Sequence, residues 1–368
     1  MTPSCRIICG DAATVLRTLP EASAQCVVTS PPYFGLRSYN GGAAEIGQEK
    51  TPAEYVAVLV AVFAEARRVL KDDGVIWVNL GDSYAGSWGN YGGQNRGKGE
   101  QREITNGSQV ENEAYSELTN QRPASSRALD GLKPKDLMGI PWRVAFALQA
   151  DGWYLRSDII WAKRNCMPES VTDRPTRSHE YIFLLTKNAH YFYDHEAIKE
   201  PCIYDVDGTG TAARKARAEG NKLMPTDRVN GIRPGGYKNS VNFDGKNSGN
   251  EKQRGHSRRH DGFSDRWDQM EKEEQCTGMR NKRDVWTIAP ANFPEAHFAT
   301  FPPDLIKPCI LAGSCVGDTV LDPFGGSGTT AMVALQLGRN AISIDLNPDY
   351  CEMQKRRTNT TPGLALPC

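Results

Sequence analysis

The sequence predicts an α/β fold with a mainly parallel sheet and helices on both of its faces. Short apolar runs of strand-like composition alternate with amphipathic helical segments near both ends of the chain. Two long polar stretches interrupt this alternation, and they are predicted to be insertions. At 368 residues the chain has room for one large domain with insertions, or for two modest domains.

The predicted elements follow from periodicity and from their end signals. Strands are expected at short apolar runs, namely residues 6–10, 25–29, 75–80, 158–162, 181–186, 319–321 and 341–344. Helices are expected where apolar residues recur at helical spacing, namely residues 12–19, 52–73, 141–149, 303–312 and 328–337. The second of these helices should have Thr51 as N-cap and Pro52 at its first position, and Gly74 should end it.

These elements divide the chain into five parts. Residues 1–85, 134–200 and 284–368 are expected to form the packed domain. Residues 86–133 have almost no apolar periodicity, which predicts a flexible insertion. Residues 201–283 form a second polar insertion, in which basic residues outnumber acidic ones by about two to one between Tyr204 and His260.

The overall composition excludes several classes of protein. The 44 basic and 44 acidic residues balance, so any nucleic-acid contact must come from local basic clusters. The 10 cysteines include no CxxC pair, which favours reduced thiols in the cytoplasm over a zinc site or a disulfide framework. No apolar run approaches the ~20 residues of a membrane span, and the N-terminus lacks a signal pattern. We therefore expect a cytoplasmic protein.

A glycine-rich turn between a predicted strand and helix indicates a nucleotide-like ligand. In the segment 319–330 the glycines let the backbone approach a ligand, and the new helix directs its amide groups at it. Asp345 ends the next strand about 20 residues further on, where a carboxylate accepts ribose hydroxyls in nucleotide-binding α/β folds. The contacts are assigned to Asp322, Phe324, Gly325, Gly326, Ser327, Gly328, Thr329 and Asp345.

A second loop suits an amine substrate. Ser30, Pro31, Pro32 and Tyr33 follow the apolar run 26–28, and two prolines cannot continue a central strand. The Pro31 carbonyl and the Ser30 hydroxyl can hold the hydrogens of a base amine and aim its lone pair, while Tyr33 can stack on the base. These four residues are the candidate catalytic residues.

Together the motifs TSPPY, DPFGGSGTT and SIDLN resemble those of DNA amino-methyltransferases that modify cytosine N4 or adenine N6. The catalytic loop precedes the cofactor loop, as in the permuted group called β. The resemblance covers about two-thirds of the chain. It implies a Rossmann-like fold with permuted motif order and polar insertions, dependent on S-adenosyl-L-methionine.

The resemblance also implies roles for residues outside these three motifs. Asp11 would bind the adenine amine of the cofactor, and Phe298 would contact its methionine part. The stretches Ile159–Lys163 and Ser178–Tyr181 resemble segments that line the base pocket. His179 and Glu180 could form a metal-binding or acid–base pair, but no second His stands at ligand spacing from His179. A structural hydrogen-bonding role is therefore expected for this pair, and no metal site.

Within the family, Ser as the first loop residue goes with cytosine N4, and Asp or Asn goes with adenine N6. Ser30 therefore favours cytosine N4, with adenine N6 as the alternative. Carbon-5 methylation is disfavoured because it needs a cysteine nucleophile after a proline in the catalytic loop. The two Pro-Cys pairs, Pro201-Cys202 and Pro308-Cys309, do not follow a strand at the right place. A catalytically inactive DNA-binding subunit and a methyltransferase for RNA or protein rank lower, because the catalytic loop is intact and the motif order differs.

Double-stranded DNA is the expected partner, with the target base flipped out of the duplex. Sequence recognition is assigned to residues 201–283, with phosphate or guanine contacts from Arg214, Lys215, Arg217, Arg254, Arg258 and Arg259. A cognate restriction endonuclease is a partner that the resemblance allows. Monomer and homodimer are both left open.

Overall fold

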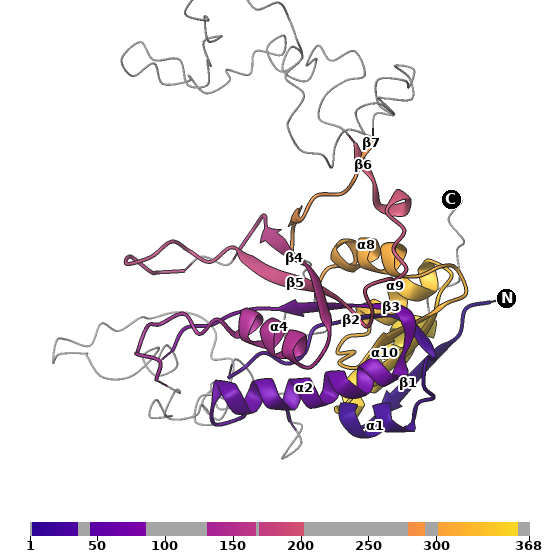
Figure 1. Cartoon of the computed structure of the whole chain (residues 1–368), viewed down its shortest axis with the longest axis horizontal. Helices are drawn as coiled ribbons and strands as arrows, with labels where there is room; N and C mark the ends of the chain where they lie inside the picture. Colours follow the sequence, from indigo (N-terminus) through magenta and orange to yellow (C-terminus); the bar gives the residue numbers. More distant parts are fainter. Residues whose placement is uncertain are drawn as a thin grey trace, which may run out of the picture. The chain divides into compact units, whose positions relative to one another are not determined.

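The computed structural model describes residues 2–35, 45–85, 131–166, 169–201, 279–290 and 301–359. The chain divides into two compact units. One comprises Met1–Ile198 with Arg283–Cys368, and the other comprises Lys199–Lys282. The central sheet and the candidate site lie in the first unit (Figure 1).

Eight strands of the described segments form one sheet in the first unit. From edge to edge they are β1 (Cys5–Cys9), β10 (Asn340–Asp345), β9 (Thr319–Asp322), β2 (Ala24–Thr29), β3 (Leu70–Leu80), β5 (His179–Thr186), β4 (Tyr154–Lys163) and β8 (Val285–Ile288). Only β5 runs antiparallel to its neighbours. The predicted α/β class with a mainly parallel sheet is confirmed.

Helices cover both faces of this sheet (Figure 1). One face is covered by α1 (Ala12–Thr18), α2 (Pro52–Val69) and α4 (Ile140–Ala150). The other face is covered by α8 (Pro303–Gly313), α9 (Thr329–Gln336) and the short 3-10 helix η2 (Glu196–Ile198), and α10 (Pro348–Asn359) packs against β1 and α9. None of the described helices combines the length and the apolar content needed to cross a membrane.

The strands divide their side chains between these two layers. Val27 and Ile76 pack in the core under α1, α2 and α4. Their neighbours Cys26 and Trp77 pack in the core under α8 and α9. Alternate residues of a strand point to opposite faces, so a strand buried on both faces is apolar along its whole length. This explains why these strands read as continuous apolar runs.

Helix α2 ends earlier than predicted. It stops at Val69, and β3 begins directly at Leu70, so Gly74 lies within the strand. A Cβ atom at Gly74 would lie 2.5 Å from the Leu70 Cγ atom and 2.9 Å from the Gln25 carbonyl oxygen. The glycine is therefore needed for a close approach between β3 and β2, where the register of the pair shifts.

The two polar stretches begin and end at neighbouring points. On either side of residues 86–130, Lys135 donates its amide proton to the Ala85 carbonyl at 2.7 Å, and Ala85 donates to the Asp136 carbonyl at 2.8 Å. In the second unit, β6 (Glu200–Pro201) pairs with β7 (Met279–Arg280), and the Arg280 guanidinium lies 2.9 Å from the Glu200 carboxylate. Short backbone stems thus join the flanks of each stretch.

The start of α2 forms the predicted cap. The Glu54 amide donates to Thr51 Oγ1 at 3.1 Å, and the Thr51 amide donates to the Glu54 carboxylate at 3.2 Å. This reciprocal pair is a capping box, with Pro52 at the first helical position. It fixes the start of the helix that supports the Ser30–Tyr33 loop.

Replacing Thr51 with alanine should therefore destabilise the protein by about 1 kcal/mol, because the Glu54 amide loses its acceptor. The measurement is the midpoint of urea-induced unfolding. Thr51→Ser keeps the hydroxyl and should behave like the wild type. Equal destabilisation by Ala and Ser would show that the cap does not contribute.

Candidate active site

The two loops identified in the sequence start side by side. Strands β2 and β9 are parallel neighbours, with Val27 opposite Leu321. At their carboxyl ends, the Thr29 hydroxyl donates a hydrogen bond to the Asp322 carboxylate at 2.6 Å. Both side chains are buried. In open α/β sheets, ligands bind beyond these strand ends, so the Ser30–Tyr33 loop and the glycine-rich loop face one site.

Helix α2 contacts the Ser30–Tyr33 loop and holds it in place. The Tyr55 hydroxyl donates to the Pro32 carbonyl oxygen at 2.8 Å. The Tyr55 ring also packs on Phe34, with ring centroids 5.5 Å apart, and Phe34 is buried. Pro31 is buried as well. The loop is therefore fixed by packing as well as by its two prolines.

Tyr33 is held at both its ring and its hydroxyl group. The hydroxyl donates to the Glu180 carboxylate at 2.7 Å and lies 3.1 Å from the Asn79 side-chain oxygen. A Cβ atom at Gly81 would lie 2.6 Å from the tyrosine ring, so only glycine fits beneath it. The ring can move little without breaking these contacts.

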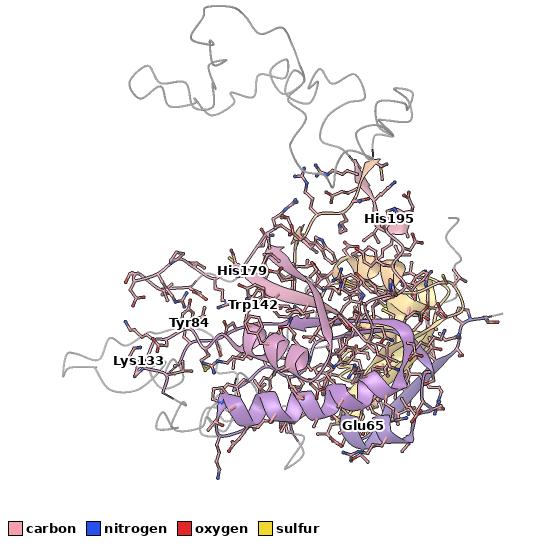
Figure 2. The ribbon with its side chains drawn as sticks, viewed as in Figure 1. Glu65, Tyr84, Lys133, Trp142, His179 and His195 are labelled. Atoms are coloured by element: carbon pink, nitrogen blue, oxygen red, sulfur yellow. The ribbon has the colours of Figure 1, made fainter. Side chains whose placement is uncertain are left out.

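The start of β5 carries an aromatic cluster beside this loop. Figure 2 labels His179 and Trp142, whose rings both pack edge-on against Tyr181 at centroid distances of 5.3 and 5.8 Å. Burial, and then the charge of Arg177, lower the pKa of His179, while Asp82 and Glu180 oppose the shift. His179 is therefore neutral at pH 7. Within the described segments, no three His, Cys, Asp or Glu side chains are grouped to hold a metal ion.

The glycine-rich loop turns tightly against β10. The Gly325 amide donates to the Ile344 carbonyl at 2.8 Å, and a Cβ atom at Gly325 would lie 2.0 Å from the Ser343 hydroxyl oxygen. Gly326 and Gly328 have φ angles of +50° and +78°, a region that favours glycine. The loop ends at Gly328, which caps the start of α9.

Helix α10 supports the glycine-rich loop through hydrogen bonds to its backbone carbonyls. Gln354 is fully buried and donates from its side chain to the Gly326 carbonyl at 3.0 Å. Arg357 donates to the Ser327 carbonyl and to the Thr329 hydroxyl. The Ser327 and Thr329 hydroxyls are buried and lie 3.1 Å apart. Their side chains thus brace the loop, which leaves its backbone to face a ligand.

Asp345 lies at the tip of β10 next to this loop. Its carboxylate accepts from the Gly326 amide at 2.7 Å and from the Asn347 amide at 2.8 Å. Burial raises the pKa of Asp345 to about 6, although both amides favour the charged form. The carboxylate is thus placed beside the loop but is costly to ionise.

Asp322 is fully buried between the two loops. Its Oδ1 atom accepts from the Thr29 hydroxyl and from the Phe324 amide, the latter at 3.0 Å. Among the described residues, its Oδ2 atom has no hydrogen-bond partner. Burial raises the pKa of Asp322 to about 6, against the hydrogen bonds from the Thr29 hydroxyl and the Phe324 amide. A buried oxygen without a partner suits a polar ligand group.

Two other predicted cofactor residues have structural contacts. Asp11 is the N-cap of α1, and its Oδ1 atom accepts from the Thr14 amide and hydroxyl at 2.8 and 2.7 Å. It follows β1, whose last residue pairs with Asp345, so the two carboxylates lie at neighbouring strand tips. Phe324 packs edge-on against Phe63 of α2, with ring centroids 6.5 Å apart.

Several predicted residues lie outside the described residues. Phe298 is one of them. The candidate DNA contacts are the others, namely Arg214, Lys215, Arg217, Arg254, Arg258 and Arg259.

The structure also adds contacts of residues that the sequence analysis did not assign to the site. Asn79 is a polar residue inside an apolar strand, which is a signal that could have marked it. Glu180 lies in a segment assigned to the base pocket, but its bond to Tyr33 spans 147 residues. Gln354 and Arg357 carry no sequence signal, because charged and polar residues are ordinary on a terminal helix.

Comparison with known proteins identifies the family. Residues 24–356 match the DNA methylase family of N6 and N4 methyltransferases. Type II methyltransferase M.Cfr9I of Citrobacter freundii is 41% identical over 353 residues, which cover 95% of this chain and 85% of the relative. Type II methyltransferase M.SmaI of Serratia marcescens is 40% identical over 357 residues, covering 96% of this chain and 90% of the relative.

Among solved structures, PvuII DNA methyltransferase (cytosine-N4-specific) superposes with a TM-score of 0.54. It is 17% identical, and the match covers 97% of this chain and 87% of that chain. This likeness shows a shared fold. Together with the match over residues 24–356 and the relatives near 40% identity, it establishes that the chain belongs to the DNA methylase family of S-adenosylmethionine-dependent N6 and N4 methyltransferases.

Proposed function

We propose that this DNA methyltransferase methylates the exocyclic N4 of cytosine in double-stranded DNA, with the base flipped out of the helix. The hydrogen bond from Thr29 to Asp322 is the main support for the proposal, because it joins the strand ends from which the Ser30–Tyr33 loop and the glycine-rich loop begin. Ser30 at the first position of that loop favours cytosine over adenine. Flipping costs a few kcal/mol, which contacts to the extruded base must offset.

The residues beside the glycine-rich loop fit S-adenosylmethionine, which supplies an electrophilic methyl group. Asp345 would accept the ribose hydroxyls, and Asp11 would accept from the adenine amine. The buried Oδ2 atom of Asp322 would accept from a donor group of the cofactor, since the described protein atoms offer it no partner. The backbone of residues 325–328 allows close approach, because side chains there turn inward or are absent.

The Ser30–Tyr33 loop would bind the base. The Pro31 carbonyl and the Ser30 hydroxyl accept the hydrogens of the amine, which draws its lone pair out of conjugation with the ring. Tyr33 presents a ring face whose position is fixed by Gly81 and Glu180. Positioning of this kind supports direct transfer to the nitrogen without a covalent enzyme intermediate. Recognition of the DNA sequence is assigned to residues 201–283 on sequence grounds alone.

Nucleoside analysis of DNA treated with the protein and S-adenosylmethionine tests the proposal. We expect N4-methylcytosine as the product. N6-methyladenine would overturn the choice of base and keep the family. Methyl label found only in RNA or protein, or in no substrate, would overturn the proposed function itself.

Gly325→Ala should weaken cofactor binding at least about tenfold, because the new methyl group would overlap the Ser343 hydroxyl and displace the loop. Isothermal titration with S-adenosylmethionine measures the effect. Adding Ser343→Ala removes the nearest overlapping atom and leaves the Gln354 side-chain nitrogen at 2.8 Å, so it should restore part of the affinity. Ser343→Ala alone is the control. A Gly325→Ala protein that binds like the wild type would show that the loop does not contact the cofactor.

Cofactor affinity should also fall as the pH drops below about 6, where Asp345 and Asp322 become protonated. A protonated carboxyl accepts fewer hydrogen bonds, and the loss is up to about tenfold per pH unit for one required ionisation. Asp345→Asn should bind weakly throughout and show a flatter profile between pH 5 and 8. Affinity of the wild type that is constant over this range would contradict these roles.

The same two groups have the opposite effect on the free protein. Their folded-state pKa values lie above the ordinary value of 3.8, so the folded state binds protons more tightly than the unfolded state. These two groups therefore raise the free energy of unfolding as the pH falls through about 6. This contribution is lost as the pH rises. Opposite trends of affinity and stability would distinguish these groups from general acid unfolding.

A further inference from the structure

A chain of side chains leads away from the Ser30–Tyr33 loop. The Ser30 hydroxyl points to the Tyr33 hydroxyl at 3.5 Å, the outer limit of a hydrogen bond. The Tyr33 hydroxyl donates to Glu180 Oε2 at 2.7 Å, and Glu180 Oε1 is paired with the Lys163 ammonium group. The two hydroxyl links run in the same direction, from the loop towards Glu180, and Lys163 donates to Glu180 from the other side.

The surrounding structure fixes this direction. The Asn79 amide group donates to the Tyr181 carbonyl at 3.1 Å, which turns the Asn79 oxygen towards the Tyr33 hydroxyl. Tyr33 therefore faces two acceptors, Glu180 and Asn79, and receives only from Ser30 among these residues. Its single proton goes to the shorter contact, the Glu180 carboxylate. Hydrogen bonds to a charged acceptor are the stronger ones.

Methylation of an exocyclic amine has to release one proton. The nitrogen lone pair forms the bond to the methyl carbon, and the electrons of the carbon–sulfur bond remain on sulfur as a neutral thioether. The nitrogen would become cationic unless one N–H bond returns its electrons to it. A group near the amine must therefore accept a proton.

We propose that Glu180 accepts this proton through Ser30 and Tyr33, with Lys163 as the residue that positions the carboxylate. The amine proton moves to Ser30 Oγ as the Ser30 proton passes to Tyr33 and the Tyr33 proton passes to Glu180 Oε2. Glu180 becomes neutral and then releases its proton to water. The inference rests on the proposed function only in requiring an amine substrate at Ser30.

Other acids near the site are engaged differently. Asp322 and Asp345 accept backbone amides on the cofactor side. Asp82 accepts from the Ile140 and Ser83 amides and faces Arg177 at 3.7 Å. Glu180, by contrast, is joined to the loop through the hydroxyl group of Tyr33.

The proton also has a way out to solvent. The Glu180 and Lys163 side chains are 14% and 23% exposed, so water can reach the pair. The neighbouring residue His179 is influenced by the charges of Arg177, Asp82 and Glu180. The 3.5 Å contact of Ser30 is long for transfer, but such contacts commonly tighten when substrate binds.

Glu180→Gln tests the proposal, because the amide oxygen can still accept from Tyr33 but cannot take its proton. We expect kcat to fall about 10²-fold, the lower end for loss of a general base. KM for DNA, Kd for S-adenosylmethionine by titration and the thermal midpoint should not change. Unchanged kcat would overturn the proposal, and so would losses of cofactor and DNA affinity that match the loss of kcat.

A double-mutant cycle with Tyr33→Phe gives the second test. Phenylalanine keeps the ring for stacking and removes only the hydroxyl. If both residues serve one chain, the double variant should be no slower than the slower single variant. Effects on kcat that multiply would show two independent roles and overturn the relay.

Asp318→Asn is the matched control. Asp318 pairs with Lys71 at 3.0 Å at the opposite, amino-terminal edge of the sheet, so this change removes one ion-paired carboxylate far from the loop. Its kcat should equal that of the wild type. The product of the wild-type protein decides the proposed function separately, since cytosine and adenine amines both release one proton.

Discussion

The site depends on one buried hydrogen bond, from the Thr29 hydroxyl to the Asp322 carboxylate. The two residues are 293 positions apart, and each is the last residue of its strand. Parallel pairing of β2 and β9 brings the strands together, and this bond fixes their tips. The loops that follow are then held from either side: α2 holds the Ser30–Tyr33 loop, and α10 holds the glycine-rich loop.

This arrangement has an energetic cost. Asp322 is fully buried with one oxygen lacking a partner among the described residues, and burial disfavours its charged form. The two carboxyl groups with raised pKa values, Asp322 and Asp345, lie beside the glycine-rich loop, whereas Glu180 beside the Ser30–Tyr33 loop is paired with a lysine. The two loops thus have different electrostatic surroundings.

The sequence predicted the fold class and both loops because their signals are local. Consecutive prolines after an apolar run, and glycines between a strand and a helix, restrict the backbone wherever they occur. The predicted length of α2 was wrong because Gly74 allows a close approach to Gln25 and Leu70, and the sequence around Gly74 does not reveal this approach. The contacts of Glu180, Gln354 and Arg357 could not be predicted for the same reason. Their partners lie far along the chain, and only pairing of the strands brings them near.

The backbone stems beside the two polar stretches affect how freely the lengths of these stretches can change. Backbone pairing of Ala85 with Lys135 and Asp136 closes one stretch, and pairing of β6 with β7 closes the other. When both ends of a segment are joined at one place, the length of the segment has little effect on the positions of the strands in the sheet. Doubling such a segment costs only about 0.6 kcal/mol of closure entropy. The polar stretches can therefore change in length during evolution while the residues at the strand tips keep their positions.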